Sequence, residues 1–332
     1  MNKRIGIYVP YSRQERTLAA FELASELVSQ GHNPLLIATE GVKGRPWGSH
    51  WDARIANGRP ARLDRHFQNC DKLFWFSHRP ELLKQARKLG IKNIFVGGTV
   101  QRSGYDPREL RSLYELDLHP AVAEDKSQQS LLRWPLPSVE PIATHDPHGL
   151  CILLDAAQLR NLRAVHGALL MAIARDHPQL PVRVLILGSS SRSDLRELQT
   201  GAALAATPVQ FLCQPTLAEL DATLRASTAA WVLSDREDYG IWCMRALACG
   251  VPVLAASTVV REALGSSDAC LLASRESTPL EQLSQLPRLL GMCVRPALIR
   301  DRLAVRRSEF STGVRTALEI AECATAEDYL SL

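Results

Sequence analysis

The sequence predicts an α/β protein of two doubly wound domains that face each other across a cleft, and three observations support this. Short apolar segments of strand length alternate with longer segments of helical period along most of the chain. The alternation stops at a proline-rich stretch, "WPLPSVEPIATHDPHG" (134–149), and then starts again. The chain has 332 residues, 46% of them hydrophobic, which is enough for two separate cores. Alternating strands and helices indicate parallel sheets that bind ligands at their carboxyl edges.

The first domain is expected over residues 1–140. A helix follows the first strand, with apolar residues recurring at helical spacing from Leu18 to Val28, and "SQGHNP" ends it. A second helix is predicted at "PELLKQARKLG", and the segment 41–67 reads as a long basic loop without a clear period. The predicted strands of this domain are "RIGIYVP" (4–10), "LLIAT" (35–39), "KLFWFS" (72–77) and "NIFVGG" (93–98).

The second domain is expected over residues 141–310. A helix is predicted over 160–175, and helical segments separate the later strands. A C-terminal helix over 311–332 is expected to pack back toward the first domain. The predicted strands are "LCILLDAA" (150–157), "VRVLILGSSS" (182–191), "VQFLCQ" (209–214), "AAWVLS" (229–234) and "PVLAAS" (252–257).

Composition argues against several classes of protein. No apolar run reaches the roughly 20 residues of a membrane span, and "MNKRIGIYVPYSR" becomes polar too early for a signal peptide. We therefore expect a cytoplasmic protein without integral membrane association. The eight cysteines include no CxxC pair and mostly have apolar neighbours, so buried thiols are expected rather than disulfides or zinc ligands.

The charge is unevenly divided along the chain. Residues 1–111 contain 19 Lys and Arg against 10 Asp and Glu, a net charge of +9. The remaining residues contain 20 against 25, a net charge of −5. A basic first domain indicates a polyanionic partner, either nucleic acid or an anionic membrane surface, although a solvated surface bias would give the same pattern.

The segment 209–257 carries many residues at fixed spacing. A Glu-Leu pair opens a helix, a strand ends in serine, and a glutamate, an aromatic-glycine pair and Ala-x-Gly-x-Pro-Val follow. The positions are Glu219, Leu220, Ser234, Glu237, Tyr239, Gly240, Ala248, Gly250, Pro252 and Val253. This pattern resembles the nucleotide-sugar-binding half of family 4 glycosyltransferases, which have the GT-B fold. The segment 11–39 is similar to the acceptor-facing loop and helix of that family.

The resemblance implies a glycosyltransferase that uses a nucleotide-sugar as donor substrate, with a UDP-sugar as first choice, and no cofactor. The diphosphate would lie at Tyr239 and Gly240, over a helix amino terminus whose free N–H groups and dipole favour an anion. Glu237 would accept hydrogen bonds from hydroxyls of the donor sugar; its alternative is an exposed turn carboxylate. Further donor contacts are expected from Gly188, Ser189 and Glu262.

Arg245 departs from the family pattern. The family has a second glutamate at this position, eight residues after Glu237, and that glutamate holds the ribose hydroxyls. Since an arginine can only donate hydrogen bonds, the ribose contact must change. Arg245 could reach a phosphate, could pair with Glu237 or Asp238, or could be a surface residue. A second departure is Val259-Val260, which replaces a Gly-Gly pair of the family's donor-side loop.

The groups that stabilise the leaving diphosphate differ as well. The family carries an arginine and a lysine after the first strand of its second domain, and the matching positions here are Asp155 and Arg160. We predict that Arg160, with Arg163 as substitute, stabilises the leaving group; both could instead be solvated helix residues. The resemblance implies retaining transfer, and His78 of "WFSH" is the candidate catalytic histidine.

No metal is expected in this mechanism. The acidic segment "DRED" (235–238) lacks the Asp-x-Asp spacing of metal-dependent transferases. His145 and His148 of "HDPH" lie in the predicted hinge, and we interpret them as linker residues rather than as a ligand pair.

The acceptor is predicted from the basic loop 41–67. Arginines suit phosphate contacts, and aromatic side chains stack on bases, especially where a base leaves the duplex. The residues proposed to bind the acceptor are Arg13, Arg16, Trp47, Trp51, Arg54, Arg59 and Arg62, and Phe67 is grouped with these aromatics. In style, this is similar to phage DNA-modifying glycosyltransferases, which act on hydroxymethylated pyrimidines in the host cytoplasm.

Two other functions stay open. The first is transfer to an envelope lipid or lipopolysaccharide, although the glycines and prolines of the loop leave no continuous apolar helix face for membrane docking. The second is a catalytically inactive scaffold that binds nucleic acid or nucleotide-sugar, which Arg245 and Asp155 suggest because they replace expected site residues.

Overall fold

The computed structural model of the protein describes most of its regular elements. In parts of these elements, among them 14–19 and 160–166, only the backbone is described. The described residues are 4–9, 14–38, 56–57, 67–68, 70–75, 88–89, 91, 93–97, 114–116, 147–187, 192–204, 208–213, 215–233, 241–255, 270–273, 277–292 and 296–323.

The chain forms two compact units. The N-terminal unit comprises residues 1–45, 49–136 and 304–332, and the C-terminal unit comprises 46–48 and 137–303. These boundaries differ slightly from the expected ones at 140 and 310. The second boundary differs because it falls within one continuous helix, α12 (Pro296–Cys323), whose first residues belong to the C-terminal unit and whose later residues belong to the N-terminal unit.

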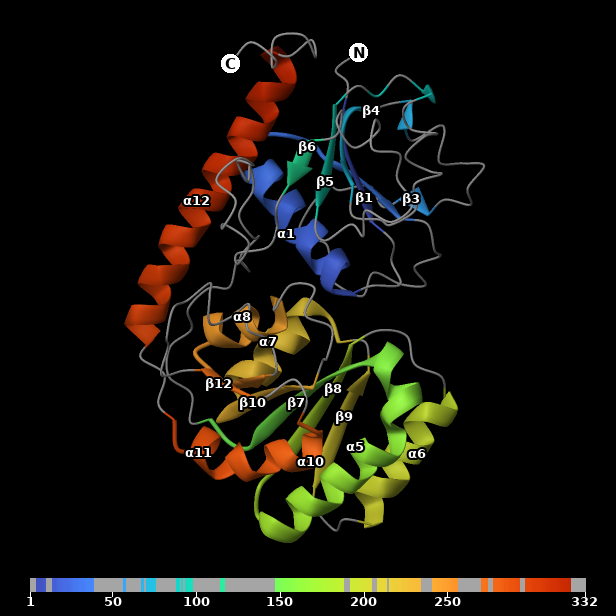
Figure 1. Ribbon diagram of the computed structural model, residues 1–332, viewed down its shortest axis with the longest axis vertical. Coiled ribbons are helices and arrows are strands. Elements are labelled where there is room, and N and C mark those ends of the chain that lie inside the picture. The colour runs from blue at the N-terminus through green and yellow to red at the C-terminus, as the bar shows by residue number, and fades with distance from the viewer. Residues whose placement is uncertain are drawn as a thin grey trace. The chain divides into compact units, whose positions relative to one another are not determined.

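The N-terminal unit contains a parallel sheet in the order β3-β2-β1-β4-β5-β6 (Figure 1). Its strands are β1 (Arg4–Val9), β2 (Leu35–Ala38), β3 (Ala56–Asn57), β4 (Cys70–Trp75), β5 (Asn93–Gly97) and β6 (Tyr114–Leu116). The helix α1 (Gln14–Ser29) ends where the sequence predicted, because Gly31 takes a φ of +84° and closes the last turn. The short strands β3 and β6 were not predicted.

Helix α12 packs against this unit through polar contacts. The side-chain amide of Gln30, just after α1, donates to the Ser311 carbonyl at 3.1 Å. The ammonium of Lys72, a buried residue of β4, donates to the Leu318 carbonyl at 3.1 Å. Burying these polar groups without hydrogen-bond partners would cost free energy, and the two bonds avoid that cost.

The C-terminal unit contains a second parallel sheet, in the order β12-β11-β10-β7-β8-β9. Its strands are β7 (Leu150–Asp155), β8 (Val182–Leu187), β9 (Val209–Cys213), β10 (Ala229–Leu233), β11 (Val253–Ala255) and β12 (Cys270–Leu272). Its helical segments are α5 (Ala156–Asp176), α6 (Arg192–Leu204), α7 (Leu217–Arg225), α8 (Ile241–Ala248), α10 (Pro279–Gln282), η1 (Leu283–Gln285) and α11 (Leu286–Leu290). The five strands predicted here are present, and β12 was not predicted.

Helices cover both faces of this second sheet (Figure 1). One face packs on α5, α6 and α11, with Trp231 fully buried at its centre. The indole N–H of Trp231 donates to the Gln282 side chain at 3.1 Å, which satisfies a polar group inside the core. The helices α7 and α8 cover the other face. This three-layer arrangement is the doubly wound fold that the sequence predicted.

Within the described part of the chain, no helix combines the length and apolarity that crossing a bilayer requires.

Candidate functional site

The strand order of the C-terminal unit gathers the predicted donor-binding segments. Strands β11, β10, β7 and β8 are neighbours in the parallel sheet, so their carboxyl ends lie at one edge. The segments that leave these ends contain Glu262 after β11 and Glu237, Tyr239 and Gly240 after β10. Arg160 and Arg163 follow β7, and Gly188 and Ser189 follow β8. Chain connectivity therefore starts all four segments at the same edge.

The centre of this edge is a topological switch point. From β7 the chain proceeds to β8 and β9 on one side, whereas β10, its other neighbour, proceeds to β11 and β12 on the opposite side. The helices that follow β7 and β10 consequently cover opposite faces of the sheet. Open parallel sheets bind ligands at such points, because the two diverging connections leave a crevice there.

Most of the predicted donor residues lie outside the described residues. These are Glu237, Gly188, Ser189, Tyr239, Gly240 and Glu262. For Arg160 and Arg163 the backbone is described: both lie in the first half of α5, whose first residue directly follows β7. Helix α8 begins at Ile241, directly after Gly240. The side chain of Arg245 is described in full.

The N-terminal unit has a similar arrangement, with its switch point between β1 and β4. Arg13 and Arg16 follow β1, and Arg16 lies in the first turn of α1, where its backbone is described. Apart from Arg16, the proposed acceptor residues lie outside the described residues, as does the candidate histidine. They are Arg13, Trp47, Trp51, Arg54, Arg59, Arg62 and His78.

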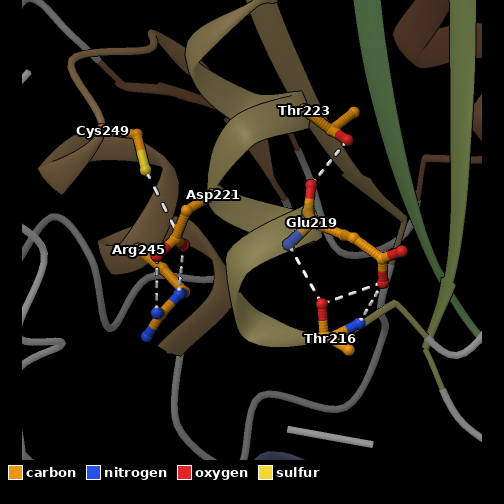
Figure 2. Close-up of polar contacts among 6 residues, drawn as sticks. All are labelled: Thr216, Glu219, Asp221, Thr223, Arg245 and Cys249. Carbon is orange, nitrogen blue, oxygen red and sulfur yellow. Dashed lines mark hydrogen bonds and ion pairs between the residues drawn. The ribbon is translucent and has the colours of Figure 1, made fainter. Parts of the chain in front are cut away.

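Arg245 forms a bidentate ion pair with Asp221 (Figure 2). Its Nε atom donates to Asp221 Oδ1 at 2.6 Å, and its Nη2 atom donates to Oδ2 at 2.9 Å. The side chain of Arg245 is 4% exposed and that of Asp221 is 13% exposed. The pair therefore links α8 to α7 in an environment with little water, where charge-assisted bonds are strong and directional.

The Cys249 thiol extends this cluster. Cys249 Sγ lies 4.0 Å from Asp221 Oδ1 and donates toward it. Burial, and secondarily the Asp221 carboxylate, raise the pKa of Cys249 to about 12, so the thiol keeps its proton at neutral pH. Burial also raises the pKa of Cys151, in the neighbouring strand β7, to about 12. These sulfur atoms are hydrogen-bonding core groups and are poor nucleophiles.

Helix α7 begins with a capping box that fixes Glu219. Thr216 Oγ1 accepts from the Glu219 N–H at 3.2 Å, and Glu219 Oε2 accepts from the Thr216 N–H at 2.8 Å. The Thr216 hydroxyl also donates to Glu219 Oε2 at 2.9 Å. These bonds, above all the one from the Thr216 backbone, lower the pKa of Glu219. The Glu-Leu pair of the sequence motif thus lies in the first turn of α7, where Glu219 forms the capping box with Thr216.

Helix α8 ends in a tight turn that explains a second part of the motif. The Val251 N–H donates to the Ala246 carbonyl and the Gly250 N–H donates to the Leu247 carbonyl. Gly250 has a φ of +80°, which residues with a side chain rarely adopt. The glycine of Ala-x-Gly-x-Pro-Val is therefore required by the backbone at the end of α8.

The fold of the chain matches solved structures, although no protein-family model and no curated protein matches it in sequence. A glycosyltransferase from Rickettsia africae ESF-5 superposes with a TM-score of 0.61 at 12% identity, over 97% of this chain and 98% of that one. WaaG, a glycosyltransferase involved in lipopolysaccharide biosynthesis, superposes with a TM-score of 0.55 at 12% identity, over 96% and 100%. An alpha-glucosyltransferase in complex with UDP and a 13-mer DNA superposes with a TM-score of 0.53 at 10% identity, over 97% and 100%.

The chain has the GT-B fold. The fold class predicted from the sequence is thereby confirmed. The structure of this GT-B chain shows the two sheets, their strand orders and which segments start at their carboxyl edges. The residue types in those segments indicate their chemistry.

The structure corrects the interpretation of Arg245. The sequence left three roles open, and the surface role is wrong, because the residue is 3% exposed. Its Nε and Nη2 atoms contact Asp221, a partner that none of the three roles included. The spacing gave no signal for this pair, because its two residues lie on different helices.

The structure also corrects Phe67, which was grouped with base-stacking aromatics. Phe67 is fully buried, and its ring lies 6.0 Å from that of Tyr8 and 6.4 Å from that of Trp75. The rings of Tyr8 and Trp75 stack at 4.2 Å. Phe67 therefore belongs to the core of the N-terminal unit, where aromatic packing stabilises the fold.

Proposed function

We propose that this protein is a glycosyltransferase that binds a nucleotide-sugar at the carboxyl edge of the second sheet. The observation that carries the proposal is the strand order β11-β10-β7-β8, which starts four candidate segments at one edge, around a switch point. The GT-B fold of the chain supports the reaction class. A UDP-sugar is the donor of first choice, because the alpha-glucosyltransferase with the same fold was solved with UDP.

In this proposal the donor diphosphate lies at the amino terminus of α8, beside Tyr239 and Gly240. Free N–H groups at a helix start and the helix dipole both favour a diphosphate anion. Arg160, or Arg163 in its place, adds a cation from α5 on the other side of the switch point, and Glu237 holds hydroxyls of the sugar. Gly188, Ser189 and Glu262 complete the donor contacts from neighbouring segments.

The transfer proposed is retaining and metal-independent. The bond from the anomeric carbon to the diphosphate oxygen breaks, and the acceptor hydroxyl oxygen bonds to the same carbon on the same face. Cleavage leaves the bonding electrons on the diphosphate oxygen, and the helix terminus and Arg160 can stabilise this negative charge until the leaving phosphate takes the hydroxyl proton. His78 follows the carboxyl end of β4 in the N-terminal unit and is the candidate residue near the acceptor.

The ribose contact differs from that of the related family. The matching position is Arg245, whose Nε and Nη2 atoms are bound to Asp221, so no carboxylate is available there. Another group of the site must accept hydrogen bonds from the ribose hydroxyls. We expect weaker discrimination between ribose and deoxyribose in the donor than a carboxylate at this position would give.

The proposed acceptor is a hydroxymethylated pyrimidine in DNA. The net charge of +9 over residues 1–111 favours a polyanion, and the candidate arginines and tryptophans follow β1, β2 and β3 in the sequence. The alpha-glucosyltransferase solved in complex with a 13-mer DNA supports the compatibility of this fold with DNA binding. Transfer to lipopolysaccharide is the second candidate, because WaaG has the same fold.

The donor test uses a panel of UDP-, GDP- and ADP-sugars, with DNA that contains hydroxymethylcytosine or hydroxymethyluracil, read by nucleoside mass spectrometry. We expect a sugar on the modified base. Glu237→Ala should abolish the product while the protein stays folded, and Asp176→Ala, which removes an exposed carboxylate at the end of α5, should not. Full activity in Glu237→Ala would remove the assignment of that residue.

The acceptor test measures DNA affinity against salt concentration. If the basic loop binds phosphates, replacing Arg54, Arg59 and Arg62 by alanine should lower the affinity and flatten its salt dependence by about one unit of slope for each phosphate that is no longer neutralised. The matched control replaces three exposed arginines, Arg196, Arg288 and Arg307, and removes the same charge. Equal decreases in affinity in both triple variants would show a charge effect without a specific surface.

The same experiments separate the other functions. A sugar transferred to purified lipopolysaccharide, with none on DNA, would establish the lipid acceptor. Binding of nucleotide-sugar without turnover on any acceptor would establish the inactive scaffold.

A further inference from the structure

The Asp221–Arg245 pair lies one helical turn from the proposed diphosphate site. Arg245 is one helical turn after Ile241, the first residue of α8. Its Nε and Nη2 atoms are bound to a carboxylate, and it is 3% exposed, so this edge of the guanidinium is closed to a donor phosphate. The pair therefore acts on α8 itself.

Two contacts of helix α8 differ in kind. Met244 and Leu247 are buried apolar side chains, whose contacts are non-directional and allow small shifts of a helix along its neighbours. The bidentate ion pair is directional, because two parallel N–H···O bonds fix both the distance and the angle between the groups. It joins the second turn of α8 to α7.

Helix α7 is a firm support for this contact. Its first turn is held by the capping box of Thr216 and Glu219, and the Thr223 hydroxyl bonds back to the Glu219 carbonyl at 2.7 Å. Its apolar residues Leu220 and Leu224 are fully buried. Asp221 lies between them on a helix that is fixed at its start and against its neighbours (Figure 2).

We propose that Asp221 and Arg245 are positioning residues for the nucleotide-sugar, an inference that rests on the proposed function. The pair holds the first turn of α8 where its N–H groups can bind the diphosphate. A helix of eight residues has little more than two turns and moves as one hydrogen-bonded body, so a small shift of its second turn also moves its first turn. A misplacement on the order of 1 Å at a binding group costs up to roughly a hundredfold in activity.

The test compares ligands that do and do not carry the diphosphate. The probes are UDP and inorganic pyrophosphate, which require the first turn of α8, and uridine, which does not. In Asp221→Asn we expect the dissociation constants of UDP and pyrophosphate to rise together by about tenfold or more. The dissociation constant of uridine should stay within about twofold, a difference of less than about 0.5 kcal/mol.

The control variant removes the same interaction where it is exposed. Arg175 donates to Asp176 at 2.7 and 3.0 Å in the same bidentate geometry, with side chains that are 76% and 40% exposed. Asp176→Asn should change none of the three dissociation constants. Thermal unfolding of each variant sets the assay temperature well below its midpoint, so that only folded protein is compared.

Two further variants keep the test decisive if Asp221→Asn does not fold. Arg245→Lys keeps the charge but loses the bidentate geometry, and should weaken UDP and pyrophosphate binding to an intermediate degree. The double variant Asp221→Arg with Arg245→Asp reverses the pair, and should recover much of the affinity that either single variant loses.

Three results would overturn the inference. The first is a folded Asp221→Asn or Arg245→Lys protein with unchanged affinity for UDP and pyrophosphate, which would make the pair purely structural. The second is a folded reversed pair that binds both probes as weakly as the single variants, since the charge of Arg245 itself would then matter. The third is an unmodified protein that binds neither UDP nor pyrophosphate and also fails the nucleotide-sugar panel, which would overturn the proposed function as well.

Discussion

Asp221 and Arg245 form a closed ion pair between two helices, whereas Arg175 and Asp176 form the same two hydrogen bonds in solvent. The side chains of Asp221 and Arg245 are 13% and 4% exposed, and those of Arg175 and Asp176 are 76% and 40% exposed. Water and salt screen the second pair and hardly reach the first. The two pairs have the same geometry but differ in exposure, so we expect the Asp221–Arg245 pair to contribute more to stability.

Asp221→Asn should lower the free energy of unfolding by about 3–5 kcal/mol, because it leaves the charge of Arg245 buried without its carboxylate. Asp176→Asn should leave the free energy of unfolding almost unchanged. Urea denaturation of both variants measures the difference. Similar decreases in the two would contradict the burial of the first pair.

Phe67→Ala should lower the free energy of unfolding by about 3–5 kcal/mol, since it leaves a cavity beside the stacked rings of Tyr8 and Trp75 in the core. Its DNA affinity, measured on folded protein, should not change. Trp47→Ala is the comparison, because Trp47 is still proposed to stack on bases and its removal should weaken DNA binding. A decrease in DNA affinity as large for Phe67→Ala as for Trp47→Ala would show that Phe67 contributes to DNA binding and not only to the core.

Glu219→Ala should destabilise the protein at neutral pH and have little effect in acid. Hydrogen bonds from Thr216 lower the pKa of Glu219 below its ordinary value of 4.5, so ionised Glu219 stabilises the folded state. This contribution is present above pH 4.5 and is lost as the pH falls through the lowered pKa. Urea titrations of both proteins across this range measure the effect. A stability difference that widened in acid would have the wrong sign.

Gly250→Ala should cost about 1–2 kcal/mol, because a residue with a side chain is strained at a positive φ. Among the described residues other than its chain neighbours, no heavy atom lies within 4 Å of the Cβ that it would add, so the cost is conformational. Gly149→Ala should cost more, because Gly149 has a φ of +87° and its Cβ would also meet the Pro181 carbonyl. Thermal unfolding of both variants orders the two costs, and the reverse order would contradict this account.

Most of the regular elements could be predicted from the sequence, because apolar periodicity is local. The buried strands β7, β8 and β10 stand out as apolar runs of strand length, and the glycine after α1 marks its end. Strands β3, β6 and β12 have two or three residues each, too few to show a period. They exist as strands because a neighbouring strand offers them hydrogen bonds.

Of the polar contacts on α7 and α8, one could be predicted from local spacing and another could not. The Thr-x-x-Glu spacing of Thr216 and Glu219 is a capping-box signal that is visible in the sequence. The pairing of Arg245 with Asp221 had no such signal, because 24 residues separate them and only the packing of α8 on α7 brings them together. Phe67 was misassigned for a related reason, since an aromatic residue beside arginines looks the same whether its ring is buried or exposed.

Local patterns in the amino-acid sequence were sufficient to predict most of the strands and helices in order, the two doubly wound units and the positions of the candidate residues after particular strands. Each of these follows from residue types a few positions apart. The strand order around the switch points, the partner of Arg245 and the burial of Phe67 emerged from long-range packing. These depend on which distant segments bury their surfaces against each other, a choice that is made by the free energy of the whole unit and not by any local pattern.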